Sequence, residues 1–412
     1  MTEIRSFLLD NTVQHYDWGT KNAHAYIASL LGVEPRPDTP YAELWIGAHP
    51  KAPSSVRKNS DHIPLPDFIS LAPRDVLGSR AAEHFNHQLP FLLKVLSAGA
   101  PLSIQAHPDK ALAAQLHARD PKNYPDANHK PEIAVALTEL TALAGFKPFR
   151  DLVHTVERYR PLAEAAGSEA VDRLRADVSA DAARQQEVLR FFFTTLMERL
   201  QADPGLLERS IDTLDDVLCA DTSGANVEER EFFFAFRKLY RYDIGLLSML
   251  LLNIVHCKKG EGLFLGPGIP HAYIEGSIVE CMANSDNVVR AGLTPKFKDV
   301  ETLCRMLTYE CGAPELLRPV INPDGSGLTV YPSPAAEFSL ARRVMNESDA
   351  FTLDDRRVLE ILLVIEGSVS LVHEGGRQLF KQGDTVLIPA ALSRYELTAH
   401  THAELFVASI PD

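Results

Sequence analysis

The sequence has few cysteines and no paired cysteine motif. Five cysteines occur among 412 residues, at positions 219, 257, 281, 304 and 311. An odd and widely spread set of this kind is typical of a reduced compartment, and it argues against a disulfide framework and against a cysteine-based zinc site. We therefore expect a cytoplasmic protein.

A long hydrophobic run is also missing. The most apolar stretch, residues 244–255, contains Ser248 and Asn253 and is shorter than the about 20 apolar residues that cross a bilayer. The first ten residues lack the basic and apolar regions of a secretory signal. We expect no membrane association, and we interpret 244–255 as a buried helix.

An excess of positive charge is absent too. The chain carries 41 basic and 55 acidic side chains, which gives a formal net charge of −14. So acidic a chain is a poor candidate for binding nucleic acid or an anionic membrane. A phosphorylated small molecule remains possible as a ligand if a few basic residues gather locally.

The remaining composition is that of a globular protein with two or three domains, since 45% of the residues are hydrophobic and 23% are charged. Short β-type runs fill residues 1–147, and helical periodicity replaces them in 148–256. One helix face is predicted from the three-and-four spacing in 186–200. The apolar residues on this face are Leu189, Phe192, Phe193, Leu196, Met197 and Leu200.

The β pattern returns after the helical region and includes a repeated block. A turn, a short apolar strand and a proline occur at 262–267 and again at 383–389. His271 follows the first copy, whereas no histidine follows the second within 390–395. We expect a helix over 291–307 and a linker at 314–334. The repeat predicts two related β-barrels, of which only one has metal ligands.

These observations predict three domains. Residues 1–147 and 257–320 form a metal-binding β-domain, 148–256 form a helical insert, and 321–412 form a second β-domain without metal ligands. The predicted fold class is mainly β with an α insert.

The predicted metal ligands come from three separate strings. Gln105 and His107 are two residues apart in a β-type run, so their side chains point to the same face. Glu132 begins the next predicted strand, and His271 follows the proline turn. A lone histidine in a strand is more often a core or surface residue. Two imidazoles, one carboxylate and one amide oxygen together form a set that suits zinc or another first-row divalent ion, suits calcium much less, and leaves coordination positions open.

A second group of polar residues surrounds these ligands. Lys94 interrupts an apolar run, and a buried ammonium needs a partner or a ligand; the alternative is that its side chain reaches the surface. Residues 276–296 mix acids and bases, and this stretch could equally be an ordinary polar loop. The charged residues in it are Glu280, Asp286, Arg290 and Lys296. Of these, the arginine and the lysine beside a metal would suit a phosphorylated ligand.

Several strings then carry a resemblance to a known family. They are Gln-His-Tyr-Asp-Trp-Gly at 14–19, Glu-Leu-Trp-Ile-Gly-Ala-His-Pro at 43–50, Leu-Ser-Ile-Gln-Ala-His-Pro-Asp-Lys at 102–110, His-Lys-Pro-Glu at 129–132 and Gly-Pro-Gly-Ile-Pro-His-Ala-Tyr at 266–273. In their order and spacing they resemble type I mannose-6-phosphate isomerase over about residues 10–310.

The resemblance implies two cupin-type (jelly-roll) barrels with a helical insert. It implies interconversion of mannose 6-phosphate and fructose 6-phosphate, with one zinc ion per chain held by Gln105, His107, Glu132 and His271. Arg290 matches an active-site arginine. The pocket residues that the resemblance implies are Lys94, Ser103, Lys130, Glu280, Asp286 and Lys296.

The reaction needs a base that moves a proton between C1 and C2 through a cis-enediol. Glu280, Lys130 and Asp286 are the candidates, and we favour Glu280. The expected substrate-binding residues, including those near the phosphate, are Ser103, Lys94, Lys296, Tyr273 and His129. We expect a monomer that acts on a small sugar phosphate.

Two other functions remain open from the residues alone. One is a metal- or sugar-binding module without catalysis, against which the cluster around Arg290 argues. The other is a different metal-dependent cupin enzyme such as an oxygenase, although iron sites more often combine two histidines with a carboxylate and no glutamine. An assay with mannose 6-phosphate before and after chelation separates these readings.

Overall fold

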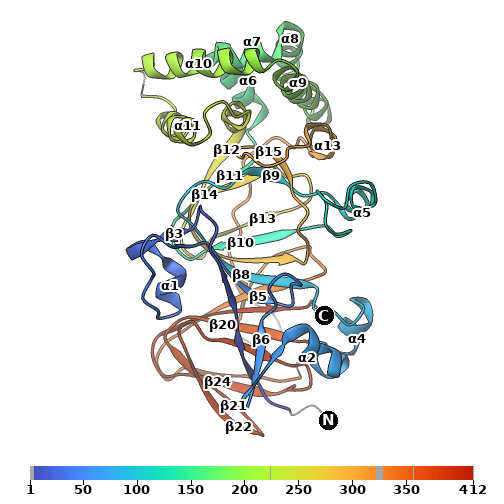
Figure 1. Cartoon of the computed structure of the whole chain (residues 1–412), viewed down its shortest axis with the longest axis vertical. Helices are drawn as coiled ribbons and strands as arrows, with labels where there is room; N and C mark the ends of the chain where they lie inside the picture. Colours follow the sequence, from blue (N-terminus) through green and yellow to red (C-terminus); the bar gives the residue numbers. More distant parts are fainter. Residues whose placement is uncertain (1–3, 223, 322–327, 356, 412) are drawn as a thin grey trace.

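A computed structural model describes residues 4–222, 224–321, 328–355 and 357–411. The molecule is elongated, with helices at one end, a ten-stranded sheet in the middle and a nine-stranded sheet toward the other end (Figure 1). No helix in the described part of the chain is long and apolar enough to cross a membrane.

The ten-stranded sheet contains the strands that carry Gln105, Glu132 and His271, and His107 directly follows one of them. Its hydrogen-bonded path is β12-β11-β14-β8-β5-β2, with β10, β13, β9 and β15 joined at the side. Its strands are β2 (Thr12–Gln14), β5 (Glu43–Gly47), β8 (Phe91–Ala98), β9 (Ile104–Ala106), β10 (Glu132–Ala136), β11 (Leu140–Phe146), β12 (Leu252–Cys257), β13 (Gly262–Leu265), β14 (His271–Ala283) and β15 (Val289–Gly292).

The nine-stranded sheet combines the two ends of the chain in the order β16-β17-β18-β25-β20-β23-β1-β6-β7. Its strands are β1 (Phe7–Asp10), β6 (Ser55–Lys58), β7 (Asp61–Pro64), β16 (Val320–Ile321), β17 (Thr329–Tyr331), β18 (Ser339–Met345), β20 (Glu360–Glu366), β23 (Thr385–Ile388) and β25 (Ala403–Ser409).

The N-terminal strands therefore depart from the predicted domain boundary. Residues 1–147 were expected in the metal-binding domain, but β1 pairs with β23 of the C-terminal part, and β6 and β7 extend the same sheet. Phe7 and Leu9 are buried in the apolar cluster that also contains Phe406. The first strand thus completes the second β-region, and the three-domain division as such stays a prediction.

Two small sheets and several short helices complete the β-regions. The four-stranded sheet has the order β19-β24-β21-β22, and β3 pairs with β4. The small strands are β3 (Thr20–Lys21), β4 (Pro40–Tyr41), β19 (Ala350–Leu353), β21 (Ser368–His373), β22 (Gly376–Lys381) and β24 (Tyr395–Ala399). The helices are η1 (Asn22–His24), α1 (Tyr26–Leu30), α2 (Leu65–Leu71), α3 (Pro73–Leu77), α4 (Ser79–His84), α5 (Lys110–Arg119) and α13 (Val300–Met306).

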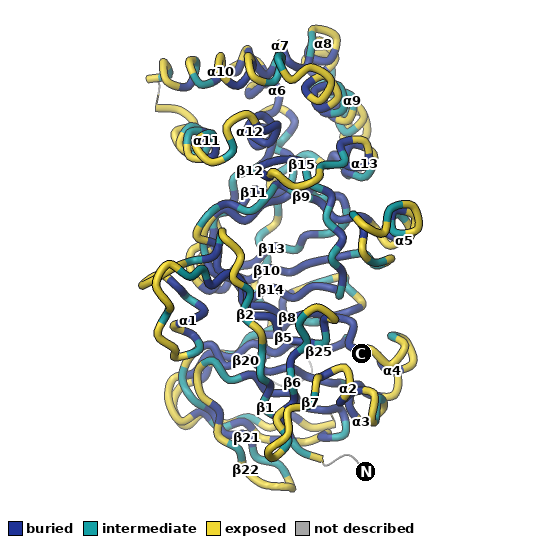
Figure 2. The backbone as a smooth tube through the Cα atoms, viewed as in Figure 1, coloured by how far each residue is buried: buried dark blue, intermediate teal, exposed yellow. Residues whose placement is uncertain are grey.

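The helical region confirms the predicted apolar face. Asp181 and Asp203 cap α9 and α10 by accepting hydrogen bonds from backbone amides, and all six predicted face residues of α9 are buried. Figure 2 shows buried and exposed residues alternating along helices such as α9 and α10. The helices of this region are α6 (Phe149–Arg158), α7 (Arg160–Ala166), α8 (Ser168–Ala176), α9 (Ala182–Ala202), α10 (Pro204–Ala220), α11 (Val227–Tyr240), α12 (Gly245–Ser248) and η2 (Met249–Leu251).

Three expected segments differ from the structure. The helix expected over 244–255 ends at Leu251, because the next residues pair as β12 with β11. The helix expected over 291–307 begins only at Val300, because Val289–Gly292 pair with β9. The expected linker 314–334 contributes β16 and β17 to the nine-stranded sheet, and its residues 322–327 lie outside the described residues.

Candidate metal centre and surrounding site

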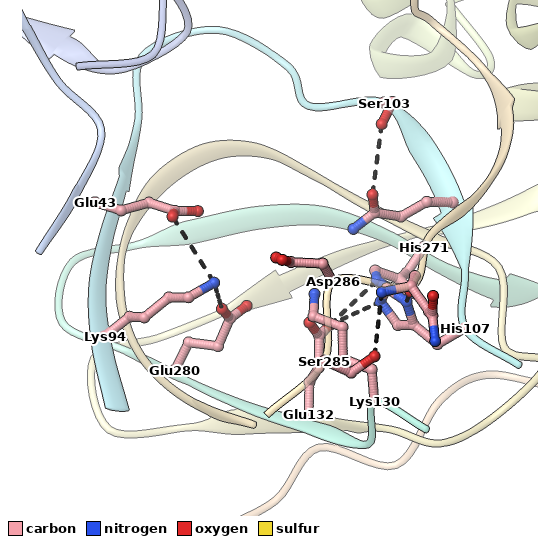
Figure 3. Close-up of polar contacts among 12 residues, drawn as sticks. Glu43, Lys94, Ser103, His107, Lys130, Glu132, His271, Glu280, Ser285 and Asp286 are labelled. Carbon is pink, nitrogen blue, oxygen red and sulfur yellow. Dashed lines mark hydrogen bonds and ion pairs between the residues drawn. The ribbon is translucent and has the colours of Figure 1, made fainter. Parts of the chain in front are cut away.

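Three predicted ligands meet in the interior of the ten-stranded sheet. His107, Glu132 and His271 are all buried, and their ligand atoms lie within 4.8 Å of one another. Glu132 Oε2 is 3.3 Å from His107 Nε2 and 3.4 Å from His271 Nε2. Among the described residues, this is the group of three metal-ligating side chains that converges on one point (Figure 3).

Strand pairing brings these residues together from distant positions in the chain. Gln105 in β9 is paired with His271, the first residue of β14. The turn before His271 needs glycine, because Gly268 has φ of +74° and a Cβ there would lie 2.6 Å from the Met306 carbonyl oxygen. The Gly268 amide also donates to the His107 carbonyl at 2.9 Å, so the two histidine-bearing segments are directly connected.

Backbone carbonyls set the orientation of both imidazoles. His107 Nδ1 lies 2.8 Å from the carbonyl oxygen of Asn287, and His271 Nδ1 lies 2.9 Å from that of Ile269. A carbonyl only accepts, so each Nδ1 donates and each Nε2 keeps its lone pair. Both Nε2 lone pairs then face Glu132. A metal ligand needs this tautomer of histidine, in which Nδ1 carries the proton.

Lys130 provides positive charge beside the same carboxylate. Its Nζ lies 2.5 Å from Glu132 Oε1, and both side chains are buried. Burial by itself would raise the pKa of Glu132, but the positive charge of Lys130 is the largest opposing influence, and this pKa is held well below its usual range. Burial also lowers the pKa of His107 to about 4. The site therefore combines a carboxylate with a neutral His107 imidazole.

The unpaired polar atoms fit a divalent ion. His107 Nε2, His271 Nε2 and Glu132 Oε2 are buried, and none of them has a hydrogen-bond partner in the part of the chain that the structure describes. Leaving three such atoms unsatisfied is costly in a folded protein, whereas a cation between them would satisfy all three. Two imidazole nitrogens and a carboxylate oxygen are donors typical of zinc.

Gln105 is the fourth predicted ligand, and it lies at the same end of the sheet. It is half-buried, and its Oε1 accepts a long hydrogen bond of 3.5 Å from Ser103 Oγ. Ser103 thus lies beside one predicted metal ligand, and its contact with a substrate stays a prediction. The role of Gln105 as a ligand stays a prediction.

Lys94 lies between two carboxylates in the same sheet. Its Nζ is 3.0 Å from Glu280 Oε2 and 3.8 Å from Glu43 Oε2, and it lies over the Trp45 ring. Burial by itself would lower the pKa of Lys94, but Glu280 and Glu43 raise it above its usual range. The alternative that Lys94 reaches the surface is therefore wrong, because the side chain is buried and paired.

Glu280 connects this ion pair to the metal centre. Burial raises the pKa of Glu280 above its usual range, although Lys94 acts in the opposite direction, and the negative charge of Glu132 raises it further. Figure 3 shows Lys94 with its two carboxylates beside the group of Glu132 and the two histidines. A buried carboxylate with a raised pKa in such a place can accept a proton near neutral pH.

Asp286 and Arg290 come from the segment that follows β14. Asp286 Oδ2 lies 2.7 Å from Lys51 Nζ and 3.5 Å from His49 Nε2, which outweigh burial and hold the pKa of Asp286 well below its usual range. Arg290 is half-buried and is paired through its backbone with Gln105. Among the described residues no carboxylate forms an ion pair with Arg290, so its guanidinium is available to an anion.

The last three predicted residues have different surroundings. Tyr273 is buried, and burial together with the nearby Glu280 raises the pKa of its hydroxyl well above the usual value. Its ring centre is 6.2 Å from that of His271. His129 Nε2 pairs with Glu337 Oε1 at 2.6 Å, so this imidazole is held by the C-terminal part of the chain. Lys296 is exposed. Contact of these residues with a substrate stays a prediction.

Sequence reasoning missed the residues that orient the predicted ones. Glu43 accepts from the Trp45 indole at 2.5 Å and also contacts Lys94. Other such residues are His49, Lys51, Asp126 and Asn287. Glu43 and His49 lie within the family motif at 43–50, and this motif was the signal in the sequence that could have identified them. Nothing local distinguishes Asp126 from an ordinary loop aspartate.

Comparison with known proteins places these features in one family. Residues 6–149 match the family model described as phosphomannose isomerase type I, catalytic domain. Mannose-6-phosphate isomerase of Homo sapiens is 37% identical over 384 residues, which cover 90% of this chain and 89% of the relative. Mannose-6-phosphate isomerase 2 of Arabidopsis thaliana is 37% identical over 391 residues, which cover 92% and 87%.

Solved structures show the same likeness over the whole chain. The mannose 6-phosphate isomerase of Salmonella typhimurium bound to fructose 6-phosphate and zinc has a TM-score of 0.83 at 31% identity and covers 99% of this chain and 100% of its own. A mannose 6-phosphate isomerase bound with zinc and yttrium has a TM-score of 0.82 at 31% identity with the same coverage. The predicted fold class is confirmed, and the two cupin-type barrels are consistent with these structures.

Proposed function

Because the chain belongs to the type I mannose-6-phosphate isomerase family, we propose that it interconverts mannose 6-phosphate and fructose 6-phosphate at the centre formed by His107, Glu132 and His271. The observation that carries this proposal is the convergence of three buried, unpartnered ligand atoms beside a proton-accepting carboxylate and a free guanidinium. A small sugar phosphate is a suitable substrate for this acidic chain, because basic residues gather locally around the site.

We propose one zinc ion per chain, held by His107, Glu132, His271 and Gln105. Three of these residues present donor atoms that face one another, and zinc accepts this mixture of nitrogen and oxygen ligands. When bound, zinc polarises sugar oxygens and stabilises negative charge that develops on them. Arg290 lies next to Gln105 on the neighbouring strand and can stabilise the same charge.

Glu280 is the proposed base for proton transfer between C1 and C2 through a cis-enediol. Its raised pKa and its position beside Glu132 support this role over Lys130, which is committed to Glu132 at 2.5 Å, and over Asp286, whose pKa is held low by His49 and Lys51. Lys94 then holds and orients Glu280. That role replaces the expected one at the phosphate, because the Lys94 ammonium is already paired.

Other groups are available for the phosphate and for ring opening. Lys296 is exposed and Ser103 is half-buried beside Gln105, so we propose that these two contact the phosphate. Lys130, whose ammonium lies beside the metal centre, can donate a proton to a sugar oxygen during ring opening. His129 is a less suitable candidate for substrate binding, because its Nε2 is already paired with Glu337. A cytoplasmic location remains our expectation from the scattered cysteines, and a monomer remains an expectation beside it.

The test is an assay that couples fructose 6-phosphate formation to a colour change. We expect turnover of mannose 6-phosphate by the protein as purified, loss after dialysis against a chelator, and recovery with zinc. Metal analysis should give about one zinc per chain. A protein that binds zinc but turns over no mannose 6-phosphate would favour the binding-module reading, and full activity without metal would exclude the metal mechanism.

A further inference from the structure

Two loops, residues 126–128 and 285–287, are joined by hydrogen bonds beside the site, and neither loop contains a predicted metal ligand. Ser285 Oγ donates to Asp126 Oδ1 at 2.8 Å and the Asp286 amide donates to Asp126 Oδ2 at 2.8 Å. The Asn287 side-chain amide donates to the carbonyl oxygens of Asp126 at 2.7 Å and of Asn128 at 2.9 Å. Residues 126–128 and 285–287, here called the loop clamp, thus form one hydrogen-bonded unit.

The loop clamp reaches the metal centre through one backbone carbonyl. Asn287 is fully buried, and its carbonyl oxygen is the acceptor for His107 Nδ1 at 2.8 Å. This contact fixes the ring so that Nε2 faces Glu132. The position of the carbonyl depends on the position of residue 287, which depends in turn on the three hydrogen bonds that the Asn287 side-chain amide makes with Asp126 and Asn128.

The same unit borders two other parts of the site. Residue 128 is followed directly by His129 and Lys130, and Glu132 begins β10. On the other side, Asp286 lies within the clamp, and its carboxylate contacts Lys51. A single carboxylate, Asp126, therefore joins the segment that leads to Glu132 with the segment that orients His107. Both loops are distant in sequence, by about 160 residues.

We propose that Asp126 and Asn287 are positioning residues that set the affinity of the site for zinc. They do so by holding the Asn287 carbonyl where it keeps His107 in its ligating orientation. This proposal rests on the proposed zinc site and adds to it a specific pair of residues that do not touch the metal. Removal of hydrogen-bond partners of ligating residues typically costs about 10–100-fold in metal affinity.

The test measures the zinc dissociation constant of the folded protein by competition with a chromophoric chelator. Asp126→Ala and Asn287→Ala are each expected to weaken zinc binding by about 10–100-fold. Because both act through one link, the double variant should lose little more than the worse single variant. Asp126→Asn keeps one acceptor oxygen but loses the acceptor for the Asp286 amide, so an intermediate loss is expected.

A matched control is available in the same part of the chain. Asp120 also accepts hydrogen bonds from an asparagine, Asn123, through both its oxygens, but it has no bond to residues 285–287. Asp120→Ala should therefore leave zinc affinity unchanged. Thermal unfolding of the zinc-free proteins separates positioning from folding, because a structural role would lower the unfolding temperature and leave the affinity of the folded protein intact.

The outcomes are distinct from those for the proposed function. Wild-type affinity in a folded Asp126→Ala or Asn287→Ala variant would overturn the positioning role, and additive losses in the double variant would overturn the shared link. Should an alanine variant not fold, Asp126→Asn decides by the same measurement. Zinc binding that responds to these variants in a protein without isomerase activity would uphold the clamp and refute the proposed function. A wild-type protein that binds no zinc would refute both.

Discussion

The two large β-regions place a buried glutamate at equivalent positions and satisfy it in different ways. Glu132 is the first residue of β10 and is paired with Leu265, the last residue of β13. Glu360 is the first residue of β20 and is paired with Ile388, the last residue of β23. Both glutamates are at most 1% exposed. The partners of the two glutamates, Leu265 and Ile388, lie in the two copies of the repeated turn, strand and proline block at 262–267 and 383–389.

The partners of the two glutamates differ. Glu132 Oε2 faces two histidine nitrogens and has no hydrogen-bond partner, whereas Glu360 Oε2 accepts from the Tyr395 hydroxyl at 2.5 Å. The region around Glu132 therefore leaves donor atoms available to an ion, whereas the region around Glu360 satisfies its carboxylate with a protein hydroxyl. The comparison teaches that the strand arrangement does not make a metal site by itself.

The turn after the proline accounts for much of this difference. In the first region the chain turns at Gly268 and returns as β14 with His271 at its start. In the second region the amides of Ala390 and Ala391 instead donate to carbonyls of Val76 and Asp75 in α3. The second turn is thus used for contact between distant parts of the chain.

The largest effect is expected from the same substitution at the two glutamates. Glu132→Gln should abolish zinc binding and isomerase activity, because a ligand carboxylate is lost and the charge of buried Lys130 is left uncompensated. Zinc content and mannose 6-phosphate turnover measure this. Glu360→Gln is the control, and a glutamine there can still accept from Tyr395. Equal loss of zinc in both variants would show that the two glutamates are not functionally distinct.

A large effect confined to turnover is expected at Glu280, which has no counterpart role in the second region. Glu280→Gln should reduce kcat by about 10²–10⁴-fold while zinc content is retained. Burial raises the pKa of Glu280, and a base works only when deprotonated. The wild-type rate should therefore fall on the acid side at a pH above the usual glutamate range.

The pH profile of kcat and a variant of a second carboxylate provide two further tests of the role of Glu280. The acid limb of kcat should disappear in Glu280→Gln, and an unchanged limb would assign it to another group. Glu43→Gln is the comparison, because Glu43 is the other carboxylate near Lys94, at 3.8 Å rather than 3.0 Å. We expect Glu43→Gln to lower kcat less than Glu280→Gln does.

A moderate effect on stability is expected where the two regions are joined by an ion network. Buried Glu404 in β25 lies 2.7 Å from both Arg342 Nε and Lys259 Nζ, and Lys259 belongs to the turn before β13. Glu404→Gln should lower the free energy of unfolding by about 1–3 kcal/mol, with Lys259 contributing least because its side chain is 47% exposed. Urea denaturation measures the change.

The network also predicts the direction of a pH dependence. Burial by itself would raise the pKa of Glu404, but Lys259 and Arg342 outweigh it and lower the pKa below its usual value. The stabilisation is therefore present above the usual glutamate pKa and is lost as the pH falls through the lowered one. The stability difference between wild type and Glu404→Gln should shrink on acidification; a difference that grows would contradict the network.

The smallest effect is expected from Tyr395→Phe. It removes one hydrogen bond to Glu360 and should cost about 1 kcal/mol of stability. Zinc affinity and turnover should not change, because none of the proposed ligands lies in the second region. Thermal unfolding followed beside the isomerase assay tests this. A loss of zinc affinity would mean that the second region acts on the metal centre, which would break the comparison.

Much of the fold and of the candidate site followed from local patterns. The apolar face of α9 was predictable from its spacing, and Gln105 and His107 could be paired because alternate residues in a strand share a face. The helix expected over 244–255 failed at Leu252 because a buried apolar run fits a helix and a central strand equally well. Only pairing with β11 decided between them.

The sequence by itself determined the kinds of donor in the metal centre, since the motif strings contain His107, Glu132 and His271 with the turns that present them. Tertiary structure decided which charges neutralise one another. Lys94 meets Glu280 across 186 positions and His129 meets Glu337 across 208. Local spacing encodes which face a side chain takes, but contacts between distant strands are set by sheet register and core packing. Such contacts form only when distant parts of the chain fold together.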